Sequence, residues 1–150
     1  MKFELKTGDW AALQTTAQVV RTEVFVHEQG IAPEDEWDAD DATATHAVIY
    51  LNADKVTPVA TARLLQPEPH IAKIGRMAVT RTLRGSGLGS QLVQALLHIA
   101  KARGDHQVRL SAQLSAEGFY TQLGFKRHGE PYDEVEISHV EMRLLIANNK

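Results

Sequence analysis

The chain has 150 residues, of which 43% are hydrophobic and 23% charged, with a formal net charge of -3 at pH 7 and no cysteine. This length suits one compact domain with a buried core, which we expect to span 1–150. The lack of cysteine excludes disulfides, thiolate nucleophiles and cysteine zinc sites, and the negative charge disfavours nucleic-acid binding. No stretch has the length of a signal peptide or membrane span, so we expect a cytoplasmic protein without a membrane partner.

The N-terminal part of the chain is predicted to form a strand followed by a long helix. Apolar and polar residues alternate over 2–6, which indicates a strand. Asp9 is a suitable N-cap for a helix that runs to about His27, and apolar residues recur along this helix at spacings of three and four. The acidic stretch 34–41 is predicted to be a loop or a broken helical turn.

The next segment is predicted to form a hairpin and a third strand. The strands are expected at 47–51, 59–65 and 71–79. A turn at 55–58 joins the first two, and Pro67 and Pro69 are expected to end the second of them. Gly75 is expected to mark a bulge in the third strand.

The second half of the chain alternates helices and strands. Its elements are predicted as helix 87–103, strand 108–112, helix 115–123 with Ser115 as its cap, strand 125–130 and strand 137–145. Gly104 is expected to stop the first of these helices. The whole order is β-α-β-β-β-α-β-α-β-β, which indicates an α/β fold with a mixed sheet and helices on its faces.

A glycine-rich turn links a central strand to the longest of these later helices. A helix N-terminus carries unpaired N–H groups and partial positive charge, so it binds phosphates, and glycines let a pyrophosphate approach the backbone. No Gly-Lys-Ser/Thr follows, which excludes a P-loop, and the glycine spacing differs from a dinucleotide fingerprint. A flexible turn with solvated arginines is the plainer alternative. The turn consists of Arg84, Gly85, Ser86, Gly87, Leu88, Gly89 and Ser90.

Two motifs together resemble the GNAT superfamily of N-acetyltransferases. Arg84-x-x-Gly87-x-Gly89 resembles its pyrophosphate-binding signature, and the segment 116–125, Ala-Glu-Gly-Phe-Tyr-Thr-Gln-Leu-Gly-Phe, resembles its second signature. The chain is similar to the ElaA/YjcF branch at 21–29, 61–65, 110–113 and 137–142. The resemblance implies a GNAT-like domain whose central, twisted, mixed sheet has about seven strands, with helices on both faces.

This resemblance also implies acetyl-CoA as the acyl donor, with no metal. It places the cofactor on the glycine-rich turn and on six further residues: Met77, Ala78, Val79, Gln113, Phe119 and Tyr120. Many family members carry asparagine where Gln113 stands, and glutamine keeps the amide chemistry with a longer reach. The histidines show no spacing that suggests a metal site.

Acetyl transfer to an amine requires a neutral amine, a polarised carbonyl and a proton for the departing thiolate. The resemblance places Tyr120 near the cofactor sulfur, where its phenol can act as general acid, and makes the Met77 N–H the oxyanion donor. Glu28 and His139 are candidate bases. Packing in the core or at the surface is the alternative for Tyr120 and His139, and a water chain could replace a dedicated base.

The acceptor is expected to be a primary amine of a small molecule or peptide. Glu28, Arg63 and Arg76 are candidate acceptor-binding residues. The acidic stretch could attract a cationic amine or be merely solvated, whereas Arg63 could hold an acceptor carboxylate or phosphate. Two other functions stay open: a non-catalytic acyl-CoA sensor and, more distantly, an acyl-homoserine-lactone synthase-like enzyme. We expect a monomer or homodimer.

Overall fold

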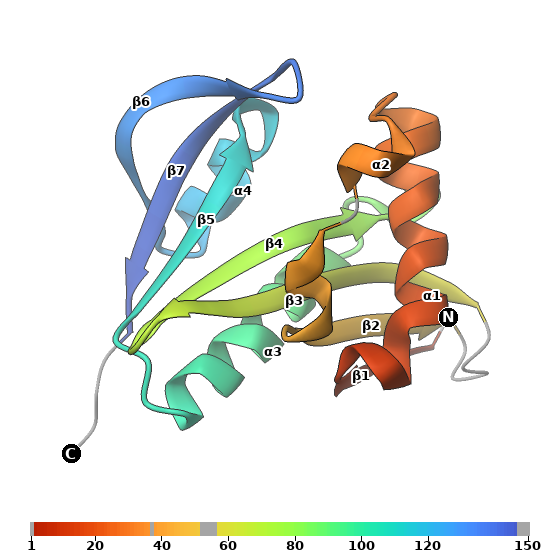
Figure 1. Ribbon diagram of the computed structural model, residues 1–150, viewed down its shortest axis with the longest axis horizontal. Helices are drawn as coiled ribbons and strands as arrows, with labels where there is room; N and C mark the ends of the chain where they lie inside the picture. The colour runs from red at the N-terminus through yellow and green to blue at the C-terminus, as the bar shows by residue number, and fades with distance from the viewer. Residues whose placement is uncertain (1, 37, 52–56, 147–150) are drawn as a thin grey trace.

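The structure is a computed structural model that describes residues 2–36, 38–51 and 57–146. Its element order agrees with the predicted order (Figure 1). The strands are β1 (Phe3–Gly8), β2 (Thr45–Leu51), β3 (Pro58–Glu68), β4 (Ile71–Val79), β5 (Gln107–Gln113), β6 (Lys126–Glu134) and β7 (Ile137–Leu145). The α-helices are α1 (Trp10–Arg21), α2 (Pro33–Glu36), α3 (Leu88–Ala102) and α4 (Glu117–Gln122). None of the described helices is long and apolar enough to cross a membrane.

The strands form one seven-stranded mixed sheet, as predicted, and their order in it is β1-β2-β3-β4-β5-β7-β6. β4 and β5 are the parallel pair, and all other neighbours are antiparallel. The β4–β5 pairing extends only from Ile71 opposite Gln107 to Ile74 opposite Leu110. Beyond these residues the two strands diverge (Figure 1), so one edge of β4 is left without β5 as a partner.

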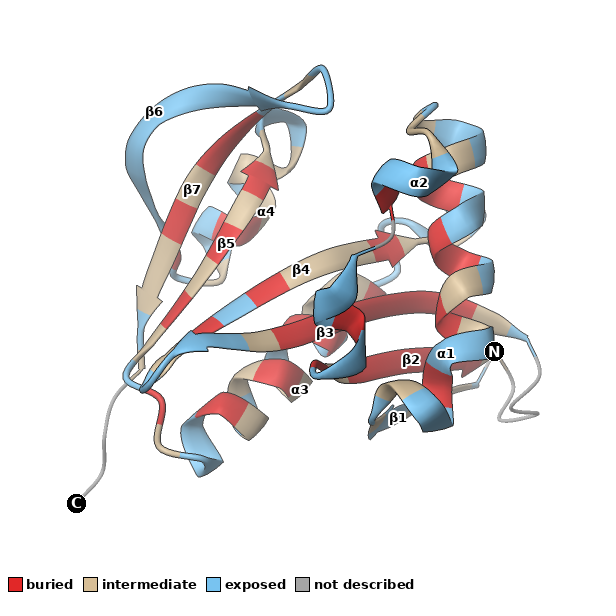
Figure 2. Ribbon diagram, viewed as in Figure 1, coloured by how far each residue is buried: buried red, intermediate tan, exposed pale blue. Residues whose placement is uncertain are grey.

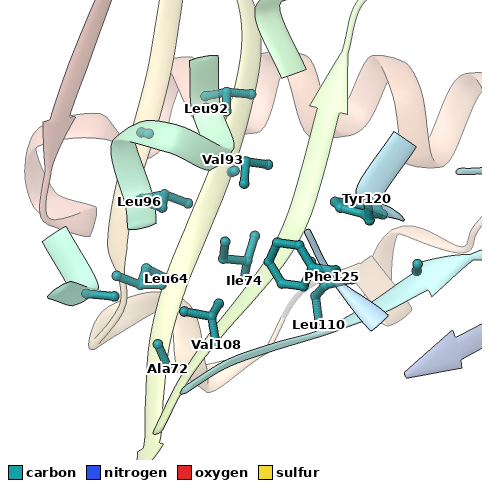
Figure 3. Close-up of a cluster of buried hydrophobic side chains, with 14 of the residues drawn as sticks. Leu64, Ala72, Ile74, Leu92, Val93, Leu96, Val108, Leu110, Tyr120 and Phe125 are labelled. Carbon is teal, nitrogen blue, oxygen red and sulfur yellow. The ribbon is translucent and has the colours of Figure 1, made fainter. Parts of the chain in front are cut away.

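Helices cover both faces of the sheet, because alternate residues of a strand point to opposite sides. In β2, Ala47 and Ile49 belong to the main core, which includes Leu92 and Leu96 of α3 (Figure 3). Their neighbours Val48 and Tyr50 instead pack with Leu13 and Ala17 of α1. Helices therefore pack on both faces of the sheet, as predicted. β2 and β3 lie between these helices and are buried along most of their length (Figure 2).

The first helix differs from its prediction. Asp9 does cap α1, accepting a hydrogen bond from the Ala12 N–H at 2.9 Å. The α-helix ends at Arg21, however, and the chain continues as a π-helix, η1 (Thr22–Glu28). A π-helix is rare and often occurs at functional sites. Its wider turn lets the sequence neighbours Val24 and Phe25 both be buried with Ala78, which a plain 3.6-residue period does not predict.

Several predicted boundaries were wrong. β3 runs through Pro67 to Glu68, because the β3–β4 register is irregular there and the ladder needs no N–H from a proline. Ser115 is not a cap: the N-cap of α4 is Ala116, which follows a 3₁₀ turn, η4 (Leu114–Ala116). β6 extends beyond its predicted end at 130 to Glu134. The prediction stopped too early because all residues of this strand are exposed and show no hydrophobic alternation. Residues 55 and 56 of the turn predicted at 55–58 lie outside the described residues.

Candidate active site

A cleft of about 1250 Å³ opens where β4 and β5 diverge. It is bordered by η1, α2, β4, the N-terminus of α3, α4 and the β6–β7 hairpin. The structure brings nearly all predicted site residues to this one cleft. The lining includes Glu28, Arg63, Arg76, Met77, Ala78, Val79, Arg84, Gly85, Gly87, Leu88, Gly89, Ser90, Gln113, Phe119, Tyr120 and His139.

Ser86 is the predicted cofactor residue that does not line the cleft in the described structure. Its hydroxyl turns back and hydrogen-bonds to the Leu83 carbonyl oxygen. This contact closes η3 (Arg81–Leu83), the 3₁₀ turn that precedes the glycine-rich segment. Ser86 therefore shapes the turn instead of facing the cleft.

The glycine-rich turn has the geometry of an anion cradle. Gly85 and Gly87 have φ angles of 84° and 89°, in the left-handed region that favours glycine. A Cβ at either position would meet nothing within 4 Å, so the space beside the backbone is open. Gly87 is the N-cap of α3 and offers no side-chain acceptor, which leaves the first-turn N–H groups available to a ligand. The cradle thus fits a pyrophosphate.

The third glycine of the turn has a packing role. A Cβ at Gly89 would lie 3.2 Å from Cζ of Phe119, which is tighter than an ordinary contact. Phe119 in turn meets Tyr120 edge-on, with ring centroids 5.0 Å apart. The two signature motifs are therefore in direct contact, and this contact explains why a small residue follows the cradle.

β4 contains a bulge beside Gly75. Thr61 pairs with Ala78 and Arg63 with Gly75, so two steps along β3 match three along β4. The extra residue falls at Arg76 and Met77, directly after the predicted Gly75, and Arg76 has a φ of 48°. Backbone strain of this kind is often found at functional sites. The bulge therefore lies in the part of β4 that is not paired with β5, and Met77 belongs to it.

Tyr120 lies beside this bulge. Its hydroxyl is 3.9 Å from Sδ of Met77, and the residue is 7% exposed. Its ring also meets Phe125 edge-on, so it belongs to the core as well as to the cleft (Figure 3). Burial raises the pKa of Tyr120, which keeps the phenol protonated at neutral pH.

Glu28 is engaged with the glycine-rich turn and is thereby a poor base. Its carboxylate accepts hydrogen bonds from Nη1 and Nη2 of Arg84 at 2.5 and 2.6 Å, and Arg81 lies 3.6 Å away. The hydrogen bonds from Arg84 lower the pKa of Glu28 below its usual value. Nε of Arg84 donates to the Val79 carbonyl oxygen at 3.0 Å. Glu28 and Arg84 thus tie η1 to the end of β4.

His139 lies on the opposite wall and pairs with Gln113 in the β5–β7 ladder. Its Nδ1 is 2.7 Å from the Ile137 carbonyl oxygen, which can only accept, so Nδ1 is the donor in this contact and the neutral ring has its lone pair on Nε2. The ring stacks on Tyr132, whose hydroxyl hydrogen-bonds to Ser111. Its position on β7 agrees with the predicted alternation, since Val140 is fully buried on the other face.

Two arginines and three carboxylates form an ion network beneath the part of the cleft that Arg63 lines. Arg21 pairs with Glu36 and Asp41. Arg63 donates to Asp41 at 2.8 Å and to both carboxylate oxygens of Asp38 at 2.6 and 2.9 Å. Glu36 and Asp41 are buried, so these two acidic residues are neither solvated nor free to attract an amine. The hydrogen bonds from Arg63 lower the pKa of Asp38 to about 2.

Sequence reasoning missed two residues that support this site, Gln29 in the cleft lining and the buried Arg21. Gln29 exchanges side-chain hydrogen bonds with Gln113 at 3.0 and 3.5 Å, which joins the two walls. Arg21 anchors the acidic stretch to α1. The one signal for both was their place in the segment 21–29 that resembles the ElaA/YjcF branch, since their partners lie far away in sequence.

No group of His, Asp and Glu suited to a metal ion occurs among the residues described.

Comparison with known proteins agrees with this geometry. The sequence profile of the acetyltransferase (GNAT) domain matches residues 13–146. A Bacillus subtilis protein assigned as an acetyltransferase is 35% identical over 127 residues, covering 85% of this chain and 86% of its own.

Two solved structures share the fold over nearly their whole length. An acyl-CoA N-acyltransferase from Pseudomonas aeruginosa is 32% identical with a TM-score of 0.82, covering 95% of this chain and 99% of its own. Escherichia coli ElaA is 29% identical with the same TM-score and coverage. The chain therefore belongs to the GNAT family of acetyltransferases and is an acyltransferase.

Proposed function

We propose that the protein is an acetyl-CoA-dependent N-acetyltransferase that acts on a primary amine of a small molecule or peptide. The observation that carries this proposal is the cleft itself. It joins an anion cradle at Gly85–Ser90 to a polar wall containing His139, with the bulge at Met77 and the hydroxyl of Tyr120 between them. A donor and an acceptor could thus meet at the bulge.

The residues that would hold the donor follow from the geometry. The N–H groups at the start of α3 would bind the pyrophosphate, with Arg84 beside them. The free edge of β4 at Met77 and Val79 offers backbone groups to the pantetheine arm, and the Gln113 amide faces the same space. Acetyl-CoA would supply the acyl group as a reactive thioester.

The reaction needs two hydrogen-bond donors in this chain. In the transfer, a bond forms between the acceptor nitrogen and the acyl carbon, the carbon–sulfur bond breaks, and the sulfur takes up a proton. The Met77 N–H would stabilise charge on the carbonyl oxygen. Tyr120, whose phenol stays protonated because it is buried, would supply the hydrogen bond and proton to the sulfur.

His139 is the better of the two candidate bases. A lysine-like amine is only about one part in a thousand neutral at pH 7, so removal of its proton helps the reaction. Glu28 is held by Arg84, whereas His139 lines the cleft and its neutral ring would offer a lone pair on Nε2. His139 would accept the amine proton directly or through water.

The test is a transfer assay with acetyl-CoA and a broad panel of primary amines, followed by thiol release and mass spectrometry of the products. We expect N-acetylated product from at least one amine class. Stoichiometric binding of acetyl-CoA with no product from any amine would instead identify an acyl-CoA sensor. A requirement for an acyl-carrier-protein thioester in place of acetyl-CoA would support the synthase-like alternative.

A further inference from the structure

We call the part of the cleft around Arg63, Gly75 and Arg76 its acceptor side. It contains a buried hydrogen-bond donor that has no partner among the described residues. Arg63 is 4% exposed, and its two terminal nitrogens are occupied by Asp38 and Asp41. Its Nε–H, however, has no hydrogen-bond partner in the described structure. An unsatisfied buried donor destabilises a protein by about 1–3 kcal/mol, so such groups normally have a partner.

The space next to this donor is kept open by Gly75. Gly75 pairs with Arg63 across β3 and β4, and both residues line the cleft. A Cβ built on Gly75 meets a single neighbouring atom within 4 Å, Nε of Arg63 at 3.9 Å. The φ of Gly75 is outside the left-handed region, so the backbone does not require glycine here. The missing side chain therefore leaves room for a ligand atom at the Cβ position of residue 75, next to the buried Nε.

Two further cationic side chains, Arg76 and Lys73, line the cleft near this opening. Arg76 donates from Nε to the Glu36 carbonyl oxygen at 3.1 Å, and its described ion pair is with Asp38 at 3.2 Å. Asp38 is already shared with Arg63. Burial, and to a smaller extent the charge of Arg63, lower the pKa of Arg76 below its usual value. Lys73, exposed on β4, also lines the cleft. An added anion would be stabilised here.

We propose that Arg63, Gly75, Arg76 and Lys73 form a carboxylate subsite, and that the acceptor is a primary amine that also carries a carboxylate. One carboxylate oxygen would accept from Nε of Arg63 and the other from Arg76. Because Arg76 directly precedes Met77, an amine attached near this carboxylate would lie close to the acyl carbon. This inference rests on the proposed function and names the substrate class of the same site.

The acidic residues at the rim agree with such an amphoteric acceptor. Asp35, Asp40 and Glu134 line the cleft, and all three are exposed. Their charge favours entry of an ammonium group, while the floor favours the carboxylate. This arrangement reconciles the acidic stretch with Arg63, since each meets a different end of the acceptor.

The test compares matched acceptors with acetyl-CoA as donor. Each standard L-amino acid is assayed beside its decarboxylated amine and its carboxamide. We expect at least one amino acid to exceed both partners by about tenfold or more in kcat/KM. Transfer to carboxylate-free amines with none to amino acids would overturn the subsite and leave the transferase intact. Failure to bind acetyl-CoA at all would instead contradict the proposed function.

Gly75→Ala sharpens the test, because the added methyl group fits beside Nε at ordinary contact distance yet fills the subsite. We expect Gly75→Ala to lower kcat/KM for the preferred amino acid about tenfold or more beyond its effect on the decarboxylated amine, mainly through KM, with acetyl-CoA affinity unchanged. Gly118→Ala is the matched control, since Gly118 has nothing within 4 Å and does not line the cleft. An equal effect of Gly75→Ala on both acceptors would contradict the subsite.

Discussion

The two sides of the cleft are built by different means. The proposed acetyl-CoA side, which we call the donor side, consists of backbone groups and short contiguous segments: the turn at Gly85–Ser90, the free edge of β4, and α4 with Tyr120. The acceptor side uses side chains that are distant in sequence, such as Arg63 with Asp38 and Asp41. The first side therefore depends on backbone conformation, whereas the second depends on the identity of individual side chains.

This difference also separates the effects expected of mutations. Changes on the acceptor side should remove support from buried charges and therefore act strongly on stability. Changes on the donor side should act on binding and turnover with smaller effects on stability. The predictions that follow test this separation.

The largest effect is expected for Asp41→Asn. Asp41 is 1% exposed and is paired with both Arg21 and Arg63. Burial alone would raise the pKa of Asp41, but its hydrogen bonds from the arginines outweigh this and hold it below the usual value. Loss of the carboxylate leaves two buried cations underpaired, so we expect the free energy of unfolding to fall by about 3–5 kcal/mol.

Chemical denaturation of Asp41→Asn measures this loss, and Asp40→Asn is the matched control. Asp40 is the exposed neighbour of Asp41 on the same 3₁₀ turn, η2 (Ala39–Ala42). We expect this control to change the free energy of unfolding by less than about 0.5 kcal/mol. Equal effects of the two substitutions would contradict the role given to the ion network.

Tyr120→Phe should act on turnover alone. The ring and its contacts with Phe119 and Phe125 remain, while the hydroxyl near Met77 is lost. We expect kcat to fall by about tenfold to a hundredfold, with acetyl-CoA affinity and the unfolding midpoint unchanged. Steady-state kinetics and isothermal titration measure the two quantities, and an unchanged kcat would remove Tyr120 from the proton transfer.

A smaller effect is expected in the acid stability of the protein. The pKa of Asp38 lies at about 2, below its ordinary value of 3.8, because Arg63 donates to its carboxylate. A lowered folded-state pKa stabilises the protein fully above the unfolded pKa, and this contribution is lost as the pH falls from about 4 to about 2.

Asp38→Asn should flatten this part of the stability profile. We expect the unfolding midpoints of the wild type and the variant to differ at pH 6 and to converge toward pH 2, a range set by the two pKa values. Thermal unfolding followed by circular dichroism across this range measures the convergence. A constant difference between the two proteins at every pH would show that Asp38 does not titrate against Arg63.

The fold, and the meeting of the two motifs in one cleft, could largely be predicted from the sequence. Hydrophobic periodicity is a local property, and it placed the strands and α3 close to where they lie. The motif containing Gly87 and Gly89 and the motif containing Tyr120 are contiguous, so their meeting in one cleft followed from their resemblance to known signatures. Their direct contact, through Gly89 and Phe119, emerged only from the structure.

The acceptor side could not be predicted in the same way. Glu28 was expected as a base, but its partner Arg84 is 56 residues away, and no local pattern indicates such a pair. The burial of Asp41 within a hydrophilic run likewise depends on Arg21 and Arg63 from other elements. The π-helix η1 was missed because its residues share the composition of an ordinary helix.

The most direct test of the account is calorimetric titration of acetyl-CoA into the wild type and Gly87→Ala. Gly87 has a φ of 89° at the start of α3, and a side chain there would project into the open cradle. We predict that the wild type binds one acetyl-CoA per chain and that the variant binds about tenfold or more weakly. No binding by the wild type, or equal affinity in a folded variant, would contradict the assignment of the glycine-rich turn as the pyrophosphate site.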